Sequence, residues 1–319
     1  MTPRILLNLG ILLAVIVLAV IAFYPGQHTE PATPMVTLLT VNKADVKTIS
    51  IQGSNRPALV FTKQDQQWFM TTPAQVRADE HHMSTLLNIL EQPADHKLVV
   101  DKKSLSKYGL DSPLFTMRFN DLPVAIGGTD PIRQRRYIMA QDAVFLVDDS
   151  FSRWLGEGAG AFIDAALLPP GTIIKKVQLP DFEVVKTDTQ WQYNPLNSGS
   201  GGAGAAEDSK TAHFSPDSLQ TFIDEWRYGR ALQVSLLNAP YDQPKAPQVK
   251  VFLQGQSEPV VFHEETSADD TAFVRADLNI RYHLTKDTLQ RLTKITEPQD
   301  IESDPDAEPA NEPTTPQDN

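Results

Sequence analysis

The sequence predicts an α+β protein: an N-terminal transmembrane helix followed by two tandem repeats of a mainly antiparallel β-sheet unit, with one packed helix each. Three observations lead to this prediction. The chain begins with an apolar run of bilayer length. A pattern of strands around a tryptophan, followed by a helix, occurs twice in the remainder. The strands of both copies alternate apolar and polar residues, which is typical of antiparallel sheets with one solvent-facing surface.

The apolar run extends from Ile5 to Tyr24. As a helix it spans roughly 30 Å, the thickness of a bilayer's hydrocarbon core. A cleaved signal peptide is the alternative, but such a peptide has an apolar core of about 7–15 residues that ends in small residues. This run is longer and ends in Phe23 and Tyr24, and the chain has no cysteine to carry a lipid. We therefore predict an uncleaved anchor over residues 1–24.

The flanking charges predict the orientation of this anchor. Arg4 precedes the run, whereas the next basic residue is Lys43. The positive-inside rule then leaves the amino terminus in the cytoplasm and the bulk of the chain across the membrane. In a bacterium this is an inner-membrane protein with a periplasmic ectodomain. Residues 25–44 contain three prolines and are predicted to form a semi-extended linker.

Composition excludes several classes of function. The chain of 319 residues has no cysteine, so disulfides, thiolate catalysis and cysteine-ligated zinc are ruled out. Its net charge is −12, and residues 297–319 contribute eight acidic and no basic residues. We predict a disordered acidic tail over 297–319, because this proline-rich segment has too few apolar side chains to form a core. The remainder has no basic stripe, so no nucleic-acid partner is expected.

The first predicted repeat covers residues 45–155. Val46–Ile51 alternates as a strand, and Leu59–Phe61 leads to a strand that contains Trp68. A helix follows, because apolar residues recur at the spacing i, i+3, i+4 and i+7, namely Met83, Leu86, Leu87 and Leu90.

The second predicted repeat covers residues 172–296, after a connector over 156–171. Its strands include Ile174–Leu179 and one that contains Trp191, and its helix carries the same apolar spacing. Ser215 and Pro216 are a typical N-cap and first helical residue. The apolar residues of this second helix are Leu219, Phe222, Ile223 and Trp226. We interpret each repeat as β-β-α-β-β-β with a closing helical turn.

One segment of the first repeat carries a family signature. The run Tyr108-Gly109-Leu110-Asp111-Ser112-Pro113, with Ala125-Ile126-Gly127-Gly128 and Arg136-Tyr137-Ile138 downstream, resembles the DUF4340 family of bacterial envelope proteins. The resemblance extends over about residues 45–292. It implies a membrane-anchored periplasmic protein without assigned catalytic residues, in an accessory role that includes association with ABC-type transporters. The second repeat lacks this run and has Val234-Ser235-Leu236-Leu237 nearby.

Two histidine-containing clusters are candidates for metal binding. Asp79-Glu80-His81-His82 is the denser one, but adjacent side chains on a helix point about 100° apart, so one ion does not reach both histidines. Acidic residues in a first helical turn are explained by the helix dipole. His263-Glu264-Glu265 follows a strand and is interpreted as a solvated turn. We expect no metal and no cofactor.

A third cluster is a candidate for anion binding. Gly127-Gly128-Thr129-Asp130-Pro131 precedes three arginines, Arg133, Arg135 and Arg136. Glycines allow a close backbone approach and arginines bind phosphate or carboxylate, although the same residues are ordinary turn signals. We expect residues 127–136 to form an exposed loop whose guanidinium groups have no carboxylate partner within the fold.

The predicted function follows from these features. No Walker A or G-x-S-x-G motif occurs, and no nucleophile–base pair is recognisable. We therefore expect a non-catalytic ectodomain, a scaffold or accessory subunit of an envelope complex with protein partners beside the membrane. The alternative is a binding module for an anionic polymer or lipid headgroup through Arg133–Arg136. An enzyme is the least favoured hypothesis.

Overall fold

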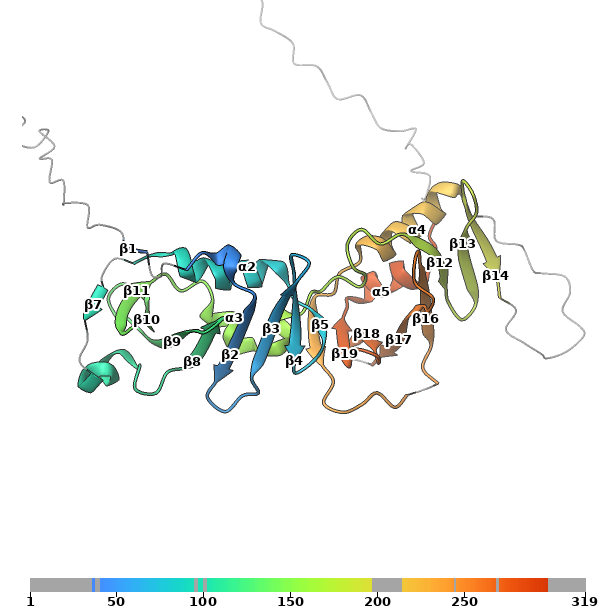
Figure 1. The fold of residues 1–319 in the computed structure, drawn as a ribbon. Coiled ribbons are helices and arrows are strands. Elements are labelled where there is room, and N and C mark those ends of the chain that lie inside the picture. Colours follow the sequence, from blue (N-terminus) through green and yellow to red (C-terminus); the bar gives the residue numbers. More distant parts are fainter. Residues whose placement is uncertain are drawn as a thin grey trace, which may run out of the picture. The chain divides into compact units, whose positions relative to one another are not determined.

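The computed structural model describes residues 36–37, 41–94, 97–99, 102–196, 214–243, 245–267 and 270–297 (Figure 1). The predicted anchor, most of the linker, the Gly/Ser-rich insertion after residue 196 and the tail beyond Glu297 lie outside these ranges. No helix in the described part of the chain is long and apolar enough to cross a membrane.

The fold is α+β and contains two large antiparallel sheets. The first sheet has nine strands in the order β5-β4-β3-β2-β8-β9-β10-β11-β7, and the second has eight in the order β14-β13-β12-β16-β17-β18-β19-β15. Apart from β5, the two orders match strand for strand. In sheet order the first contains Val76–Arg77, Gln67–Thr72, Leu59–Gln64, Thr48–Gly53, Phe115–Phe119, Leu122–Thr129, Arg136–Ala140, Ala143–Val147 and Lys97–Val99. The second contains Trp191–Pro195, Phe182–Lys186, Ile174–Gln178, Gln248–Leu253, Val260–Thr266, Thr271–Arg275, Ile280–His283 and Gln233–Leu236.

The predicted strand count of each repeat is too low. At least three strands precede the helix in each half, and a short edge strand, β7 or β15, lies between the helix and the last four strands. The expected hairpin around Trp68 is confirmed, because β3 and β4 pair antiparallel, and its turn residues Asp65 and Gln66 both have positive φ without being glycine or asparagine. The edge strands were missed because three or four residues do not show a reliable alternation.

Contacts divide the described residues into two compact units. The first contains residues up to Pro57 together with Ser84–Ser152. Its strands pair in a register that aligns buried residues, for example Ile51 with Met117 and Met117 with Val124. The unit also contains β1 (Val36–Thr37), β6 (Pro93–Ala94), and the 3-10 helices η1 (Lys43–Asp45), η2 (Ile89–Glu91) and η3 (Lys102–Tyr108).

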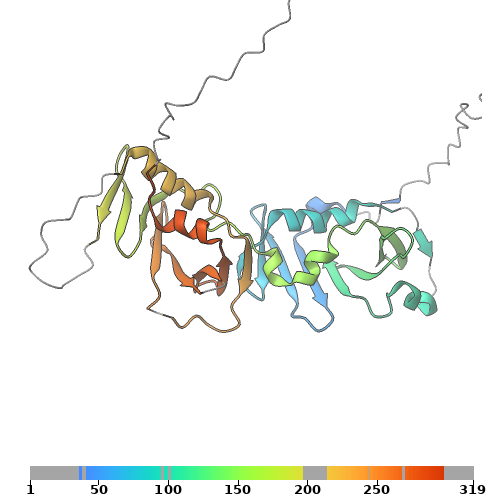
Figure 2. The same ribbon diagram turned by 180° about the vertical axis from the view of Figure 1, so that it is seen from behind.

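The second unit contains Ala58–Met83 and the residues from Arg153 onward. Helices α4 (Pro216–Tyr228) and α5 (Lys286–Thr293) lie on one side of the second sheet in both views (Figures 1 and 2). Trp226 of α4 is fully buried, and its ring lies 5.3 Å from that of Phe262 and 5.5 Å from that of Phe273. Its indole N–H donates to the carbonyl oxygen of Leu292 at 2.9 Å, so the tryptophan joins both helices to the sheet.

The helix predictions are confirmed residue by residue. All four apolar residues of the first helix and all four of the second are buried. The first helix is α2 (Glu80–Asn88), continued by η2. Ser215 is the N-cap of α4, accepting from the backbone N–H of Ser218, and Pro216 is the first helical residue.

The segment predicted as a connector makes specific contacts within the second unit. It contains the end of α3 (Ser152–Glu157) and the 3-10 helix η4 (Ala159–Phe162). Ile163 forms an antiparallel bridge with Ala78, and Ala166 forms another with Arg230. The guanidinium of Arg77 donates to the largely buried carboxylate of Asp164. This segment is therefore part of the packed structure and not a free linker.

Candidate binding site

The strands at one end of the second sheet carry polar side chains on the face away from the helices. Side chains alternate along a strand, so the residues next to core Phe262 and Tyr282 point to the other face. The strand register aligns His263 of β17 with Val274 of β18, Val274 with Arg281 of β19, and Arg281 with Ser235 of β15. The next row contains Glu265, Ala272, His283 and Gln233.

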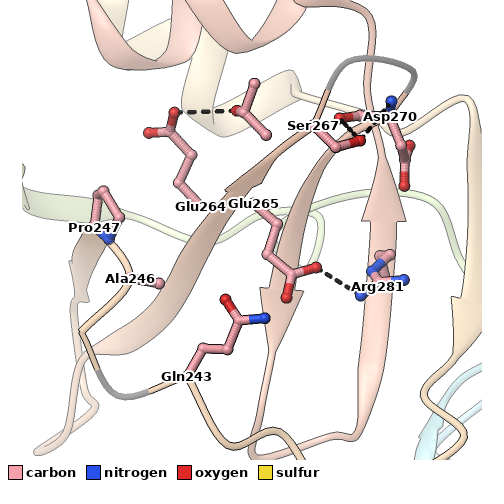
Figure 3. Close-up of a pocket in the computed structure, with 9 residues that line it drawn as sticks. Gln243, Ala246, Pro247, Glu264, Glu265, Ser267, Asp270 and Arg281 are labelled. Atoms are coloured by element: carbon pink, nitrogen blue, oxygen red, sulfur yellow. Dashed lines mark hydrogen bonds and ion pairs between the residues drawn. The ribbon is translucent and has the colours of Figure 1, made fainter.

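The segment between β15 and β16 covers part of this face, on the side away from α4 and α5 (Figure 1). The ring of Tyr241 lies 4.6 Å from that of His263, and the carbonyl oxygen of Pro247 accepts from the backbone N–H of Glu264 at 2.8 Å. Between segment and sheet lies a cavity of about 520 Å³, which we call the loop pocket (Figure 3). It is lined by Gln243, Ala246, Pro247, Glu264, Glu265, Thr266, Ser267, Asp270 and Arg281.

The charged groups of the loop pocket have different surroundings. Glu265 and Arg281 point toward each other from β17 and β19, and a guanidinium nitrogen lies 2.6 Å from a carboxylate oxygen (Figure 3). Gln243 lies beside this pair (Figure 3). Glu264 leaves β17 on the other side, where its carboxylate accepts only a long hydrogen bond, 3.5 Å, from Thr266 among the described residues. Glu264 is therefore a carboxylate to which the described residues supply no cation.

Burial keeps two neighbouring ring groups neutral. Burial lowers the pKa of His263, although Asp277 and Glu265 oppose this effect, so the imidazole is uncharged at neutral pH. Burial also raises the pKa of Tyr241, and Glu265 raises it further. The hydroxyl of Tyr241, Nδ1 of His263 and Nε of Arg281 are buried without a hydrogen-bond partner in the part of the chain that the structure describes. Such atoms usually bind water or a ligand, because a buried polar group without a partner is costly.

Beside the loop pocket, three side chains form a hydrogen-bonded row. Oγ of Ser235 lies 2.9 Å from Nε2 of His283, whose Nδ1 lies 3.0 Å from a carboxylate oxygen of Asp270. The bond with His283 holds the pKa of Asp270 below its usual value. The residue types are those of a serine hydrolase. However, the register alone brings them together, because each is the diagonal cross-strand neighbour of the next.

The corresponding face of the first sheet is closed. The residues Tyr108-Gly109-Leu110 at the end of η3, which we call the tyrosine turn, pack against β9 and β10. A Cβ atom on Gly127 would lie 2.4 Å from the carbonyl oxygen of Tyr108. Gly109 has φ +63°, and the ring of Tyr108 lies 4.9 Å from that of Tyr137. Leu110 of this turn is 4% exposed, so the turn is anchored on the strand by a buried side chain.

This arrangement explains why the signature residues occur together. The turn needs a glycine for its positive φ, and the strand beneath it needs Gly127 for the close approach. The sequence profile of the DUF4340 domain, a domain of unknown function, matches residues 68–244, more than half of the chain. The chain belongs to the DUF4340 family. No curated protein and no solved structure matches it.

The DUF4340 match is narrower than the resemblance seen in the sequence. It begins at Trp68 and ends at residue 244, between β15 and β16. It therefore includes the tyrosine turn, the glycines of β9 and the start of the segment that covers the loop pocket. The strands β16 to β19 lie beyond it, and two of them, β17 and β19, carry residues that line the pocket.

The expectation that the guanidinium groups of the arginine cluster have no carboxylate partner within the fold is wrong. Arg136 donates to the carboxylate of Asp149, to Oγ of Ser152 at 2.9 Å and to the carbonyl oxygen of Gly127 at 3.2 Å. Nε of Arg135 lies 3.0 Å from a carboxylate oxygen of Asp148. Two of the three guanidinium groups thus have carboxylate partners within the fold. The partners were missed because they follow β11 and become neighbours only through the β10–β11 hairpin.

The loop itself also differs from the expectation, because Gly127–Thr129 belong to β9. Asp130 is largely buried and accepts from the hydroxyl of Tyr137 at 3.0 Å and from the backbone N–H of Arg133 at 2.8 Å. Burial raises the pKa of Tyr137, and the hydrogen bond to Asp130 adds to this effect. Arg133 is exposed. The carboxylate of Asp130 therefore holds this turn together.

The two histidine clusters lie in different kinds of structure, one at the start of a helix and one within a strand. Asp79 precedes α2 and accepts from the backbone N–H of His82 at 3.0 Å, as a helix cap does. The ring of His82 lies 4.2 Å from that of Trp154. Among the residues that the structure describes, no group of three or more His, Asp or Glu is arranged to hold a metal ion. The interpretation of His263-Glu264-Glu265 as a turn is wrong, because all three belong to β17.

Proposed function

We propose that this DUF4340 protein is a single-pass inner-membrane protein whose periplasmic ectodomain contains two tandem copies of one α+β unit. In this proposal it is a non-catalytic scaffold or accessory subunit of an envelope complex, and it contacts a partner protein at the loop pocket. The matching strand orders support the duplication. The apolar run Ile5–Tyr24 and the charge at Arg4 support the anchor and its orientation.

One observation carries the partner-binding role. The row that contains Ala125, Met139 and Val144 in the first sheet has His263, Val274 and Arg281 at the same positions of the second sheet, counted from the β10–β11 and β18–β19 hairpins. Replacing apolar residues by partly buried ionisable ones costs stability unless they are used. Their unpartnered atoms beside a cavity therefore favour a binding role.

The test compares proteins that are co-purified from solubilised membranes by the full-length chain and by Ala246→Trp. The indole fills the loop pocket from its covering segment, so the variant should lose the specific partner. Ala276→Trp, in the exposed turn between β18 and β19, is the matched control and should retain it. Retention of the same proteins by both variants would exclude the loop pocket as the contact site.

The anchor and orientation are tested separately. A reporter that is active only in the cytoplasm, fused after Leu155, should give no signal, and a strong signal would reverse the topology. The non-catalytic role is tested with a fluorophosphonate probe. Ser235 should remain unlabelled, because the carboxylate of Asp270 is 44% exposed and His283 is 28% exposed, so water reaches the row. Labelling of Ser235 that disappears in Ser235→Ala would identify an enzyme.

The anion-binding alternative is not carried forward. Its motive was a group of guanidiniums without carboxylate partners, and the contacts of Arg135 and Arg136 remove that motive.

A further inference from the structure

A second cavity lies on the face of β19 opposite to the loop pocket. Side chains alternate along a strand, so Tyr282 points to the core side, whereas Arg281 lines the loop pocket. The cavity has a volume of about 280 Å³, and we call it the connector cavity because residues 163–169 form one of its walls. Its other lining residues come from β4, β5 and the β18–β19 hairpin, and all of them belong to the second unit.

Most of the wall of the connector cavity is apolar. Its buried lining residues are at most 4% exposed, namely Val76, Ile163, Leu167, Leu168 and Ile280. Gln75 and Pro169 also line the cavity and are exposed, so it opens to solvent beside them. An apolar cavity of about 150 Å³ binds one benzene ring. The connector cavity therefore has room for an apolar body of roughly ten carbon atoms.

One buried polar group faces this apolar space. Tyr282 lines the cavity and is 4% exposed, and its hydroxyl makes no hydrogen bond to a residue that the structure describes. Burial raises the pKa of Tyr282 to about 12, and the charges that act on its hydroxyl include those of Arg275 and Asp164, which also line the cavity. The hydroxyl is therefore protonated at neutral pH and lies among lining residues, where it can donate to a ligand.

The first sheet has no such group at the matching positions. Counted from the β10–β11 and β18–β19 hairpins, Phe145 matches Tyr282 and Ala140 matches Arg275. A phenylalanine fills the place of the ring without burying a hydroxyl, so the shared fold does not require the hydroxyl of Tyr282. A buried polar group without a partner destabilises a protein unless water or a ligand binds it.

The carboxylate in the cavity wall is not available to a cationic ligand. Asp164 accepts from the guanidinium of Arg77 and, at 3.1 Å, from the backbone N–H of Ala166. A guanidinium nitrogen of Arg230 lies 3.4 Å from the same carboxylate. Two cations already neutralise Asp164, so an amine would enter the cavity without a counter-ion.

A carboxylate is the head group that suits the donors of the cavity. Arg275 binds Asp277 through Nε at 2.8 Å and Nη2 at 2.7 Å, which leaves Nη1 without a partner among the described residues. The guanidinium lies 5.5 Å from the ring centroid of Phe262, so it is on the same side of the sheet as Tyr282. Nη1 of Arg275 and the hydroxyl of Tyr282 both donate, and a carboxylate accepts such hydrogen bonds more strongly than a neutral group does.

We infer that the connector cavity binds a monocarboxylic acid with an apolar body of roughly ten carbon atoms. The apolar body lies against Val76, Leu167 and Ile280, and the carboxylate accepts from the hydroxyl of Tyr282 and from Nη1 of Arg275. The two cavities share no lining residue. This inference therefore stands or falls separately from the proposed partner contact at the loop pocket.

The test uses 2-naphthoate, a soluble aromatic acid of suitable size, in calorimetric titration of the full-length protein in detergent. Wild type should bind it saturably, and Tyr282→Phe should bind it at least about tenfold more weakly, because a hydrogen bond to a charged group is lost. Tyr228→Phe is the matched control, since Tyr228 is 73% exposed at the end of α4, and it should bind like wild type. Partition of the acid into micelles is the same for every variant and cancels.

Two further comparisons locate the ligand and identify its head group. Ala166→Phe places a ring in the cavity and should abolish binding, whereas Ala239→Phe, in the exposed segment after β15, should not. Methyl 2-naphthoate and 2-naphthylmethylamine keep the rings and replace the carboxylate by a neutral or a cationic group. Both should bind at least about tenfold more weakly than the acid.

Several results would overturn the inference. Equal affinity of wild type and Tyr282→Phe for the acid, or retention of binding by Ala166→Phe, would place the acid elsewhere. An ester or amine that binds as tightly as the acid would show that the carboxylate is not recognised. Absence of saturable binding to wild type would mean that the cavity holds water only. Should Ala166→Phe fail to fold, Tyr282→Phe still decides, because Phe145 shows that the strand pair accepts a phenylalanine there.

Discussion

The two sheets have one strand order, yet they use the face away from their cores differently. In the first sheet the tyrosine turn closes this face against Gly127 and Gly128. In the second sheet a longer covering segment leaves the loop pocket, and Glu265 occupies the position that corresponds to Gly127. The first sheet thus packs this face with small and apolar residues, whereas the second carries ionisable groups at the matching positions. One strand order can therefore leave this face closed or leave a cavity on it, depending on the segment that covers it.

This comparison also separates two kinds of polar group. Asp130, Arg136 and Asp149 of the first copy are satisfied by neighbours within the fold. In the second copy, Tyr241 and His263 each have a buried atom without a partner in the described residues. Buried atoms of His82 and Gln92 in the first half also have no partner among the described residues, so the contrast concerns these particular groups.

The largest expected effect concerns the helices that cover the cores. Trp226→Ala should lower the free energy of unfolding by about 3–5 kcal/mol, because it removes a fully buried ring and its hydrogen bond to Leu292. Leu90→Ala, at the equivalent position of the first helix, should lower the free energy of unfolding by about 2–5 kcal/mol. Hydrogen exchange of the full-length protein will show where protection is lost. If each sheet has its own core, Trp226→Ala exposes amides of the second sheet and Leu90→Ala those of the first. Loss of protection throughout both sheets in either variant would contradict independent cores.

A smaller effect on stability is expected at Arg136, whose guanidinium is hydrogen-bonded within the fold. Arg136→Gln should cost about 2–4 kcal/mol, because it leaves the largely buried carboxylate of Asp149 without its cation. Arg133→Gln, three residues away and exposed, is the control and should change stability little. Equal stability of the two variants in chemical denaturation would restore the view of this cluster as a solvated patch.

The same carboxylate gives this effect a pH dependence. Burial alone would raise the pKa of Asp149, but hydrogen bonds from Ser152 and Arg136 outweigh it and hold the pKa below its usual value. A lowered folded-state pKa stabilises the protein above the unfolded value of about 3.9, and this contribution is lost as the pH falls through the folded value. The stability difference between wild type and Arg136→Gln should therefore be constant near neutral pH and shrink below about pH 4.

The closed face of the first sheet is tested by adding one methyl group. Gly127→Ala should cost about 1–3 kcal/mol, because its Cβ would meet the carbonyl oxygen of Tyr108 and the tyrosine turn must move. Gly156→Ala in α3 is the matched control, since a Cβ there meets no atom within 4 Å, and it should be neutral or stabilising. A neutral Gly127→Ala would mean that the first face is as open as the second.

Much of this fold could be predicted from the sequence, and the reasons are local. The apolar spacing of Met83 to Leu90 and of Leu219 to Trp226 identified both helices, because burial on a helix has a fixed period. Ser215 and Pro216 identified the start of α4, because capping depends on adjacent residues. Such features need no knowledge of distant segments.

The candidate site could not be predicted in this way. His263, Arg281 and Ser235 are far apart in the chain and become neighbours only through the register of β17, β18, β19 and β15. The hydrogen bonds of Arg136 could not be predicted from the sequence for the same reason, because its partners become neighbours only through strand pairing. One signal was available, since His263-Glu264-Glu265 is an unusual run after an apolar strand. It was assigned to a turn because charged residues that follow an apolar strand ordinarily enter a solvated loop.

The smallest expected effect contrasts the starts of the two helices. Helix α2 is capped by the adjacent Asp79, whereas α4 also receives Glu297 from the far end of the described chain. The carboxylate of Glu297 accepts from the backbone N–H of Ser215 at 2.7 Å and from Oγ of Ser218 at 2.9 Å. These hydrogen bonds, the one from the Ser215 backbone above all, hold the pKa of Glu297 below its usual value. The contact should therefore stabilise the start of α4 at neutral pH and weaken as the pH falls through that lowered value.

Glu297→Gln tests this contact, because the amide keeps the shape of the side chain and removes its charge. Hydrogen exchange at Ser215–Leu219 should be faster in the variant at pH 7, and the difference should disappear in acid, where wild-type Glu297 is protonated as well. Exchange at the start of α2 should not change, because Asp79 caps that helix locally. Global stability should stay nearly constant, since the carboxylate is exposed to solvent and its interaction is screened. Equal exchange of the two proteins at Ser215 would show that the N-cap serine alone holds α4, as Asp79 does for α2.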